Sequence, residues 1–318
     1  MTEISAAEQV ARPAPSAPGQ APPRYSVYGR WWSGWAFVAP ALALLALFVV
    51  TPFVMALGLS FTNERLVSRP VPSEWVGLRN YARLMTDPDF WNALRNTATF
   101  AAVVVPVQSA IALGLAMLIN SSLPGRNAFR TIYFLPVIIT LTVICVIWGA
   151  LYIYPGGALN ALMKAVTFGA WEPVNWLGDR RFAMGSLIVM SIWASAGFQM
   201  VIYLAGLQNI PEDLYEAARM DEATPWQQFR WITMPMLRPT HVFVVVATTI
   251  FAFKLFTQVQ ILTQGGPRGA TDSLVRFIYV NGFSELRVGY ASAATVAFMA
   301  IVLAISLVQR GLIGREEA

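Results

Sequence analysis

The stretch AGLQNIPEDLYEAARMDEATPWQQFRWITMPMLRPT occupies residues 205–240 and is rich in charged side chains. It lies between two long apolar stretches: residues 182–211 hold no charged side chain, and residues 239–267 hold only Lys254. Apolar stretches of this length are typical of helices that cross a bilayer. We therefore interpret residues 208–240 as a polar loop through which an event outside the bilayer acts on helices inside it.

The distribution of charge along the whole chain predicts an integral membrane protein. The chain is 56% hydrophobic and 12% charged, with a mean hydropathy of +0.54, whereas about a quarter of the residues of a soluble domain are charged. A helix crosses the bilayer with about 20 apolar residues. We predict an all-α membrane protein with six transmembrane helices, at residues 35–59, 97–119, 131–153, 184–207, 242–263 and 291–310.

The N-terminal region differs in composition from the rest of the chain. Residues 1–30 are rich in proline and alanine, which predicts a disordered tail before a transmembrane domain at 31–318. Lysine and arginine are divided almost equally between the two sides of the membrane, so the positive-inside rule does not orient the chain. Arginines occur in every loop, so the net charge of +5 does not point to a nucleic-acid partner.

Several kinds of catalytic or transport chemistry are excluded by residues that the chain lacks. There is no phosphate-binding loop motif, and the two lysines, Lys164 and Lys254, do not stand in one. His241 is the sole histidine, which excludes a paired-histidine metal site, and we interpret it as an interfacial residue at the start of the fifth span. No acidic residue lies inside a predicted span, which argues against a proton-coupled carrier.

The polar loop carries the sequence signals of two short helices. Pro211 suits the first turn of a helix, and the two acidic residues that follow it complement the helix dipole. Thr224, Pro225 and Gln227 predict the start of a second helix, with Thr224 as N-cap and Gln227 completing a capping box. One alternative is a helix pair that lies passively on lipid headgroups. The acidic character of the loop argues against it, because surface-bound helices are usually basic.

The same loop resembles the EAA loop of the permeases of bacterial ATP-binding-cassette importers. The residues that carry the resemblance are Glu216, Ala217, Ala218, Asp221, Ile232 and Pro235. The similarity extends over about 35–310, through WVGLRNYARLMTDPDFWNALRNT, GRNAFRTIYFLP, VNWLGD and LTQGGPRGATDSLVRFIYVNGF. These segments resemble the carbohydrate-importer type, and within it the first permease of maltose-type transporters.

The chain departs from the family pattern at Glu222, where the family has glycine, and at Met234, where it has leucine. A residue other than glycine with a positive φ costs about 1 kcal/mol or more. Either the turn at Glu222 avoids a positive φ, helped by the cap at Thr224, or it is strained.

The resemblance implies a set of partners and an orientation. It implies a second homologous permease, two ATP-binding-cassette ATPases and an extracytoplasmic solute-binding protein, in a bacterial or archaeal cytoplasmic membrane. Both termini and the 208–240 loop would then face the cytoplasm. ATP and Mg²⁺ would bind the partner ATPases, with no cofactor or metal on this chain. The ATPase-coupling residues would be Leu214, Glu216, Ala217, Ala218, Asp221 and Phe229.

Polar and aromatic residues within two spans are candidates for the substrate pathway. Lys254 is the single charge inside a span, and burying a charge there is costly unless it faces water, a partner or substrate. Aromatic rings beside hydrogen-bonding groups suit a sugar, although helix packing explains each residue as well. The candidates are Trp193, Ser195 and Gln199 in the fourth span and Phe251, Lys254 and Gln258 in the fifth.

The sequence therefore predicts the permease subunit of an importer for a carbohydrate-like solute, driven by a separate ATPase. A stand-alone secondary transporter or channel is the alternative. An intramembrane enzyme is disfavoured by the lack of acidic residues in the spans and of a nucleophile motif.

Overall fold

The computed structural model describes residues 31–66, 73–121 and 125–314. The predicted disordered tail at 1–30 lies outside the described residues. Among those residues the secondary structure is helical, apart from one isolated β-bridge between Thr62 and Trp75. The prediction of an all-α protein is confirmed for this part of the chain.

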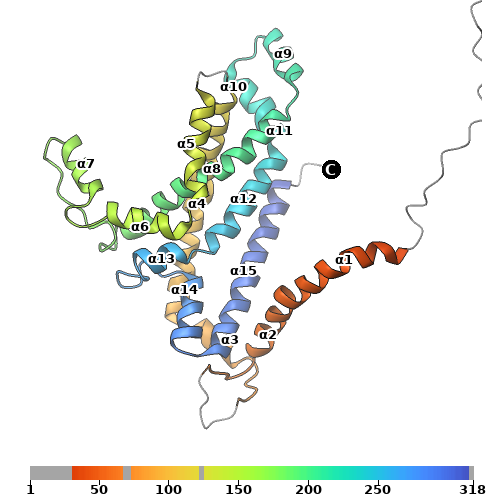
Figure 1. The fold of residues 1–318 in the computed structure, drawn as a ribbon, viewed down its shortest axis with the longest axis vertical. Coiled ribbons are helices and arrows are strands. Elements are labelled where there is room, and N and C mark those ends of the chain that lie inside the picture. Colours follow the sequence, from red (N-terminus) through yellow and green to blue (C-terminus); the bar gives the residue numbers. More distant parts are fainter. Residues whose placement is uncertain (1–30, 67–72, 122–124, 315–318) are drawn as a thin grey trace, which may run out of the picture. The chain divides into compact units, whose positions relative to one another are not determined.

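In chain order the helices are α1 (Trp31–Leu45), η1 (Ala46–Val50), α2 (Thr51–Leu59), α3 (Arg79–Thr86), α4 (Pro88–Asn120), α5 (Arg126–Ile138), α6 (Leu141–Leu151), α7 (Ala158–Val166), α8 (Ala183–Gln208), α9 (Glu212–Met220), α10 (Pro225–Gln228), η2 (Phe229–Thr233), α11 (Met234–Met236), α12 (Arg238–Phe253), α13 (Thr257–Leu262), α14 (Leu274–Tyr279), η3 (Val280–Ser284) and α15 (Val288–Gly314). Figure 1 shows the helices, and the longest connections lie between α2 and α3 and between α7 and α8. Three π-helical segments, η1 to η3, directly follow an α-helix.

The chain divides into two compact units, residues 1–53 and 54–318. The first unit holds α1 and η1. The second unit holds the helices that surround the candidate sites. Both sites described below lie entirely within this second unit.

Five helical segments are long and apolar enough to cross a membrane, and the count rises to six if a bent pair is one span. The bent pair is α5 and α6, which meet at an angle of 100°. The single helix predicted over 131–153 is therefore two helices. Ile139 and Thr140 are extended, with ψ of 136° and 140°, and Pro136 supplies no amide hydrogen to the last turn of α5.

The helix predicted over 242–263 is also interrupted. α12 ends at Phe253 and α13 begins at Thr257, and Phe256 between them has φ −141° and ψ −60°. At this break the Leu255 carbonyl accepts a hydrogen bond from a residue outside the span, the Ser273 hydroxyl, at 2.5 Å. Irregular backbone at membrane depth is tolerated where protein buries it in this way.

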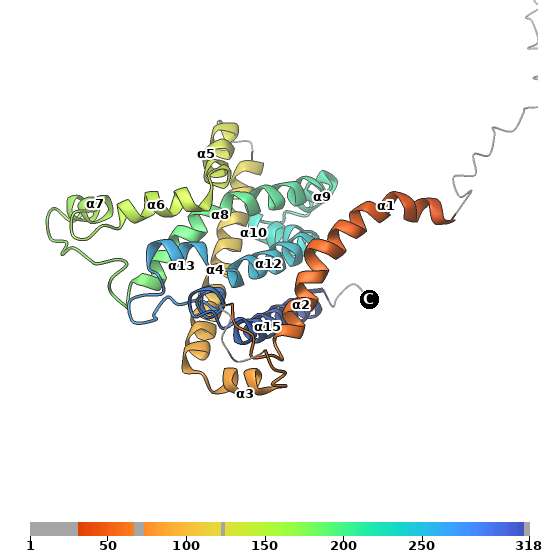
Figure 2. The same cartoon turned by 60° about the horizontal axis from the view of Figure 1, so that its bottom comes forward.

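The core lies where α4 packs against α8 and α12, and Figures 1 and 2 both show these helices side by side. Two apolar clusters fill this contact. The first, which we call the inner cluster, lies toward α9 and contains Ala112, Leu113, Ala116 and Ile119 of α4, Met200, Tyr203, Leu204 and Leu207 of α8, Ile210, Leu237 and Val244. The second, which we call the gate cluster, contains Phe100, Ala101, Val104, Leu187, Ala252, Phe253, Leu255 and Val259, with Met184 and Ile188 packed against it.

Candidate functional site

The first candidate site is the polar loop between α8 and α12. Pro211 caps α9 with an extended backbone, φ −58° and ψ 133°, and Glu212 and Asp213 lie in the first turn. Their carboxylates complement the positive end of the helix dipole. α9 ends at Met220.

The turn after α9 has the Schellman geometry. The Ala223 amide donates to the Ala218 carbonyl at 2.8 Å, and the Glu222 amide donates to the Arg219 carbonyl at 3.1 Å. This pattern places Glu222 in the left-handed region, with φ +57°. Of the two alternatives left open by the sequence, the strained turn is the one that the structure adopts.

The second helix begins with the predicted capping box. The Thr224 hydroxyl accepts from the Gln227 amide at 3.4 Å, and the Gln227 carboxamide oxygen accepts from the Thr224 amide at 2.7 Å. Pro225 occupies the first turn, as the sequence predicts. The capping box fixes where α10 starts, so it also fixes the length of the turn that joins α9 to α10.

One face of α9 rests on the membrane helices. The Tyr215 hydroxyl lies 2.9 Å from the hydroxyl of Thr233, which is buried in η2. Tyr215 and Phe229 both pack against the inner cluster. Phe229, a predicted coupling residue, is therefore half-buried beneath the loop, with Trp226 5.4 Å from it between ring centroids.

The opposite face of α9 is open. Leu214 is 40% exposed, Glu216, Ala217 and Asp221 are exposed, and Ala218 is half-buried. Sequence reasoning missed the most exposed apolar residue of this face, Met220, at 86%. The sequence signal for Met220 was its position three residues after Ala217, because residues three apart share a helix face.

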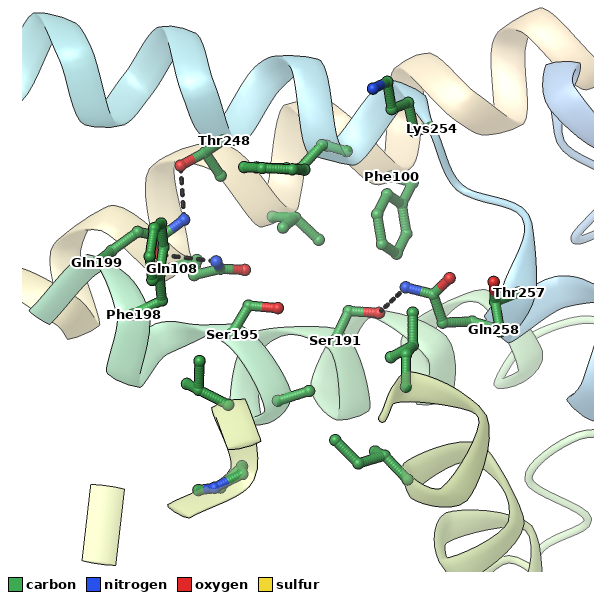
Figure 3. A pocket seen from close by; sticks show the side chains of 18 of the residues that line it. Phe100, Gln108, Ser191, Ser195, Phe198, Gln199, Thr248, Lys254, Thr257 and Gln258 are labelled. Carbon is green, nitrogen blue, oxygen red and sulfur yellow. Dashed lines mark hydrogen bonds between the residues drawn. The ribbon is translucent and has the colours of Figure 1, made fainter. Parts of the chain in front are cut away.

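The second candidate site is a cavity of about 500 Å³ between α4, the α5–α6 bend, α8 and the α12–α13 break (Figure 3). It brings together five of the six predicted pathway residues, Ser195, Gln199, Phe251, Lys254 and Gln258. The remaining lining residues are Phe100, Val104, Gln108, Pro136, Val137, Ile139, Leu141, Ile144, Ser191, Ala194, Phe198, Thr248, Ala252 and Thr257. The two helix breaks that the sequence did not reveal form part of its wall.

Buried amides join three helices at this cavity. The Gln108 amide donates to the Gln199 carboxamide oxygen at 2.6 Å, and the Gln199 amide donates to the Thr248 hydroxyl at 2.6 Å (Figure 3). Thr248 in turn donates to the Val244 carbonyl at 2.6 Å. Sequence reasoning missed Gln108 and Thr248. The signal for Gln108 was a carboxamide within a charge-free apolar stretch.

Lys254 occupies the end of α12, where a cation complements the negative end of the helix dipole. Its side chain is exposed, and Figure 3 shows its amine directed away from Ser191 and Ser195. In the described part of the chain, no carboxylate forms an ion pair with it. Gln258, on α13, instead faces the cavity and donates to the Ser191 hydroxyl at 3.4 Å.

Trp193, the sixth predicted pathway residue, is not brought to the cavity. It lies on another face of α8, with its ring 5.6 Å from that of Trp148 in an edge-to-face arrangement. His241 lies in the first turn of α12, with its Nδ1 2.6 Å from the Tyr203 hydroxyl. Within the described residues, no three His, Cys, Asp or Glu side chains are grouped as metal ligands.

Comparisons with known proteins agree on one family. The family model described as "Binding-protein-dependent transport system inner membrane component" matches residues 109–316. The chain is 36% identical to the lactose transport system permease protein LacF of Rhizobium radiobacter, over 85% of this chain and 90% of the relative. It is 31% identical to the trehalose/maltose transport system permease protein MalF of Thermococcus litoralis, over 86% and 91%.

A solved structure shares the fold. It is a bacterial ABC transporter involved in the import of the acidic polysaccharide alginate, with a TM-score of 0.78 and 25% identity. The similarity covers 90% of this chain and 96% of that chain. The likeness therefore includes the helices around both candidate sites.

Proposed function

The chain belongs to the family of binding-protein-dependent transport system inner membrane components, and we propose that its 208–240 loop is where a partner ATPase drives solute movement. The protein is a permease subunit of an ATP-binding-cassette importer of the carbohydrate type. It is a transport subunit rather than an enzyme, and ATP is hydrolysed by a partner. These relatives favour the subunit over a stand-alone carrier or channel.

The proposed topology has six spans, with α5 and α6 counted as one. Both termini and the 208–240 loop lie in the cytoplasm of a bacterium or archaeon. Support comes from the five helical segments and one bent pair that are long and apolar enough to cross the membrane. The exposed charges of the loop support its position outside the bilayer core, because charged side chains are costly there.

The proposed partners are a second homologous permease, two ATPases and an extracytoplasmic solute-binding protein. The family description names dependence on a binding protein, and a solved alginate transporter was captured with its periplasmic protein. ATP and Mg²⁺ bind the ATPases, and this chain carries no cofactor. Lipid also surrounds the apolar segment Gly34–Leu59, which is long enough to cross the membrane.

The exposed face of α9 is the proposed docking surface for the ATPase. It consists of Leu214, Glu216, Ala217, Met220 and Asp221. Small alanine side chains permit close approach of a partner, and the acidic residues suit a basic groove. Ala218 and Phe229 support this surface from below rather than contacting the ATPase directly.

Motion of α9 would reach the pathway through contacts on its other face. The Tyr215 and Thr233 hydroxyls are hydrogen-bonded, and both α9 and η2 pack against the inner cluster between α4, α8 and α12. A rigid element with this attachment transmits a displacement to packed helices instead of absorbing it. The ATPase therefore acts by binding one arrangement of these helices more tightly than the other.

The cavity of about 500 Å³ is the proposed solute pathway, lined by Ser195, Gln199, Phe251, Lys254 and Gln258. Carboxamides, hydroxyls and aromatic rings match the hydroxyl edges and apolar faces of a carbohydrate. Curated relatives are named for lactose, starch degradation products, trehalose and maltose, and sulfoquinovosyl glycerol. The observation that carries the proposed coupling is that α9 is attached to the membrane helices through Tyr215 while its opposite face is exposed.

The test is the double substitution Glu216→Arg with Ala217→Trp in the complete transporter. Both side chains are exposed, so insertion and folding are expected to be unchanged. We expect solute-stimulated ATP hydrolysis and uptake into reconstituted vesicles to be abolished. The matched control is Glu172→Arg, another charge reversal at an exposed position outside the loop, which is expected to leave both activities intact.

Undiminished uptake by the double variant contradicts the docking proposal. Uptake by the purified chain without any ATPase or nucleotide contradicts the subunit function itself. Release of the ATPase on purification of the double variant, with the control complex intact, supports direct docking at α9.

A further inference from the structure

A second, smaller cavity lies at the opposite end of α4 and α8 from the 208–240 loop. Its volume is about 240 Å³. We call it the outer pocket, and its lining residues are Asn92, Arg95, Asn96, Thr99, Arg180, Met184 and Ala270. Two arginines from different segments therefore line one small recess.

The two arginines are the charged residues among those that line the outer pocket. No aspartate or glutamate is among the residues that line it. Ion pairs join Arg276 to Asp272 and Arg287 to Glu285, and within the described residues neither Arg95 nor Arg180 forms one. A recess whose charged lining residues are both cations concentrates anions, because the low-dielectric walls focus the field.

The wall of the outer pocket is held rigidly. The Asn92 and Asn96 amides each donate to the Gly269 carbonyl at 2.8 Å. Asn96 also donates to the Asp272 carbonyl at 3.0 Å. These bonds tie the loop before α14 to α4, so they fix the wall beside Arg95.

The outer pocket and the larger cavity lie along the same two helices. On α4, Asn96, Phe100 and Val104 are spaced by four residues, so they share one face. Asn96 lines the outer pocket, whereas Phe100 and Val104 line the larger cavity. On α8, Met184 lines the outer pocket and Ser191 the larger cavity.

The gate cluster separates the two cavities. Phe100 and Val104 belong to it, and Met184 packs against it from the side of the outer pocket. A solute that enters from the outer end therefore meets Arg95 and Arg180 before it passes the gate cluster. Beyond the gate cluster, Lys254 is the one charged residue among those that line the larger cavity, and no acidic side chain there would repel an anion.

We propose that the outer pocket is an anion subsite and that the solute is an acidic carbohydrate, bearing a carboxylate, sulfonate or phosphate. The guanidinium groups of Arg95 and Arg180 bind the acidic group, since arginine matches the paired oxygens of such groups. The subsite holds the solute at the entrance until the gate cluster opens. This inference rests on the proposed import function and names its substrate class.

The test compares acidic sugars with neutral sugars of the same number of rings, in the reconstituted transporter with its binding protein. Suitable pairs are digalacturonate with galactobiose, and glucose 6-phosphate with glucose. A third pair is 6-deoxy-6-sulfoglucose, which bears a sulfonate, with glucose. The variants are R95Q and R180Q, and the matched control is R181Q. Arg181 is the exposed neighbour of Arg180 and does not line the outer pocket.

We expect ATP-driven uptake of an acidic sugar, with a KM that R95Q and R180Q each raise by about 10-fold or more at an unchanged maximal rate. The increase is expected to shrink at high salt, because salt screens exposed charges. R181Q is expected to change the KM little. Any uptake of the neutral partner sugar is expected to be unaffected by all three variants.

Uptake of neutral sugars alone overturns the inference. An equal effect of R95Q on acidic and neutral sugars also overturns it, because the arginines then contact the binding protein or lipid instead of the solute. Either result leaves import and coupling intact. Failure of the import function itself is distinguished by loss of ATP-driven uptake for every sugar in the unsubstituted transporter.

Discussion

The Tyr215 hydroxyl lies 2.9 Å from the Thr233 hydroxyl, and this contact joins the exposed helix α9 to the segment that leads into α12. Thr233 is buried, whereas the face of α9 opposite Tyr215 is open. The loop is therefore anchored on one side and accessible on the other. This asymmetry is what a lever between two proteins requires.

The first prediction concerns that anchor. Tyr215→Phe removes one hydroxyl and keeps the ring in the inner cluster, so the loss is one hydrogen bond worth about 1 kcal/mol. We expect a small fall in thermal stability and a clear rise in the ATP hydrolysed for each solute imported, measured in vesicles. Thr233→Ser, which keeps the hydroxyl, is the control and is expected to couple normally. Unchanged coupling in Tyr215→Phe would show that the hydrogen bond transmits nothing.

The second prediction concerns the strained turn after α9. Glu222 has φ +57°, and glycine adopts this conformation without the clash that a side chain causes. Glu222→Gly is expected to stabilise the folded loop by about 1 kcal/mol, seen as a higher unfolding temperature or slower hydrogen exchange in α9. Asp221→Gly is the matched control: Asp221 has φ −84°, so glycine there gains nothing and adds backbone freedom. Stabilisation by both substitutions, or by neither, argues against strain at Glu222.

Local signals in the sequence predicted the polar loop well, for a physical reason. The capping box at Thr224 and Gln227 involves residues three apart, and the turn at Glu222 is closed by bonds within six residues. Such contacts depend on residue types that are adjacent in the chain. The strain at Glu222 was left open because the choice between a strained and a relaxed turn depends on the full set of backbone bonds.

The breaks in two membrane helices were missed because composition does not record backbone geometry. Pro136 precedes the bend between α5 and α6, yet Pro106 lies inside the unbroken α4. No proline or glycine marks the break after Lys254, where the Leu255 carbonyl is satisfied by Ser273 from beyond the span. The cavity depends on both breaks, so its residues were predicted as polar positions but its walls were not.

The third prediction separates packing from solute contact at Gln199. Gln199→Leu removes the acceptor for Gln108, and an unpaired buried amide costs about 1–3 kcal/mol. The double variant Gln108→Leu with Gln199→Leu removes both polar groups, so we expect thermal stability to recover in large part. Because Gln199 also lines the cavity, we expect transport by the double variant to keep a raised KM. Recovery of transport together with stability would show that Gln199 only joins helices.

The fourth prediction concerns the pH dependence of the loop that forms one wall of the outer pocket. Burial raises the pKa of Asp272 above its ordinary value of 3.8, and the hydrogen bond from Arg276 at 3.0 Å lowers it by less. A carboxyl group with a raised pKa in the folded state stabilises the fold fully below pH 3.8 and loses that contribution as pH rises through the folded pKa. Asp272→Asn does not titrate, so the stability of the natural protein relative to this variant is expected to fall as pH rises from acid to neutral. Thermal unfolding of both proteins across this range measures it. Arg276→Gln removes the charge that lowers the pKa of Asp272, so it is expected to move the decline in stability to higher pH. If the stability difference between the natural protein and Asp272→Asn does not change with pH, the carboxyl group has the same pKa in the folded and unfolded chains, which contradicts the prediction.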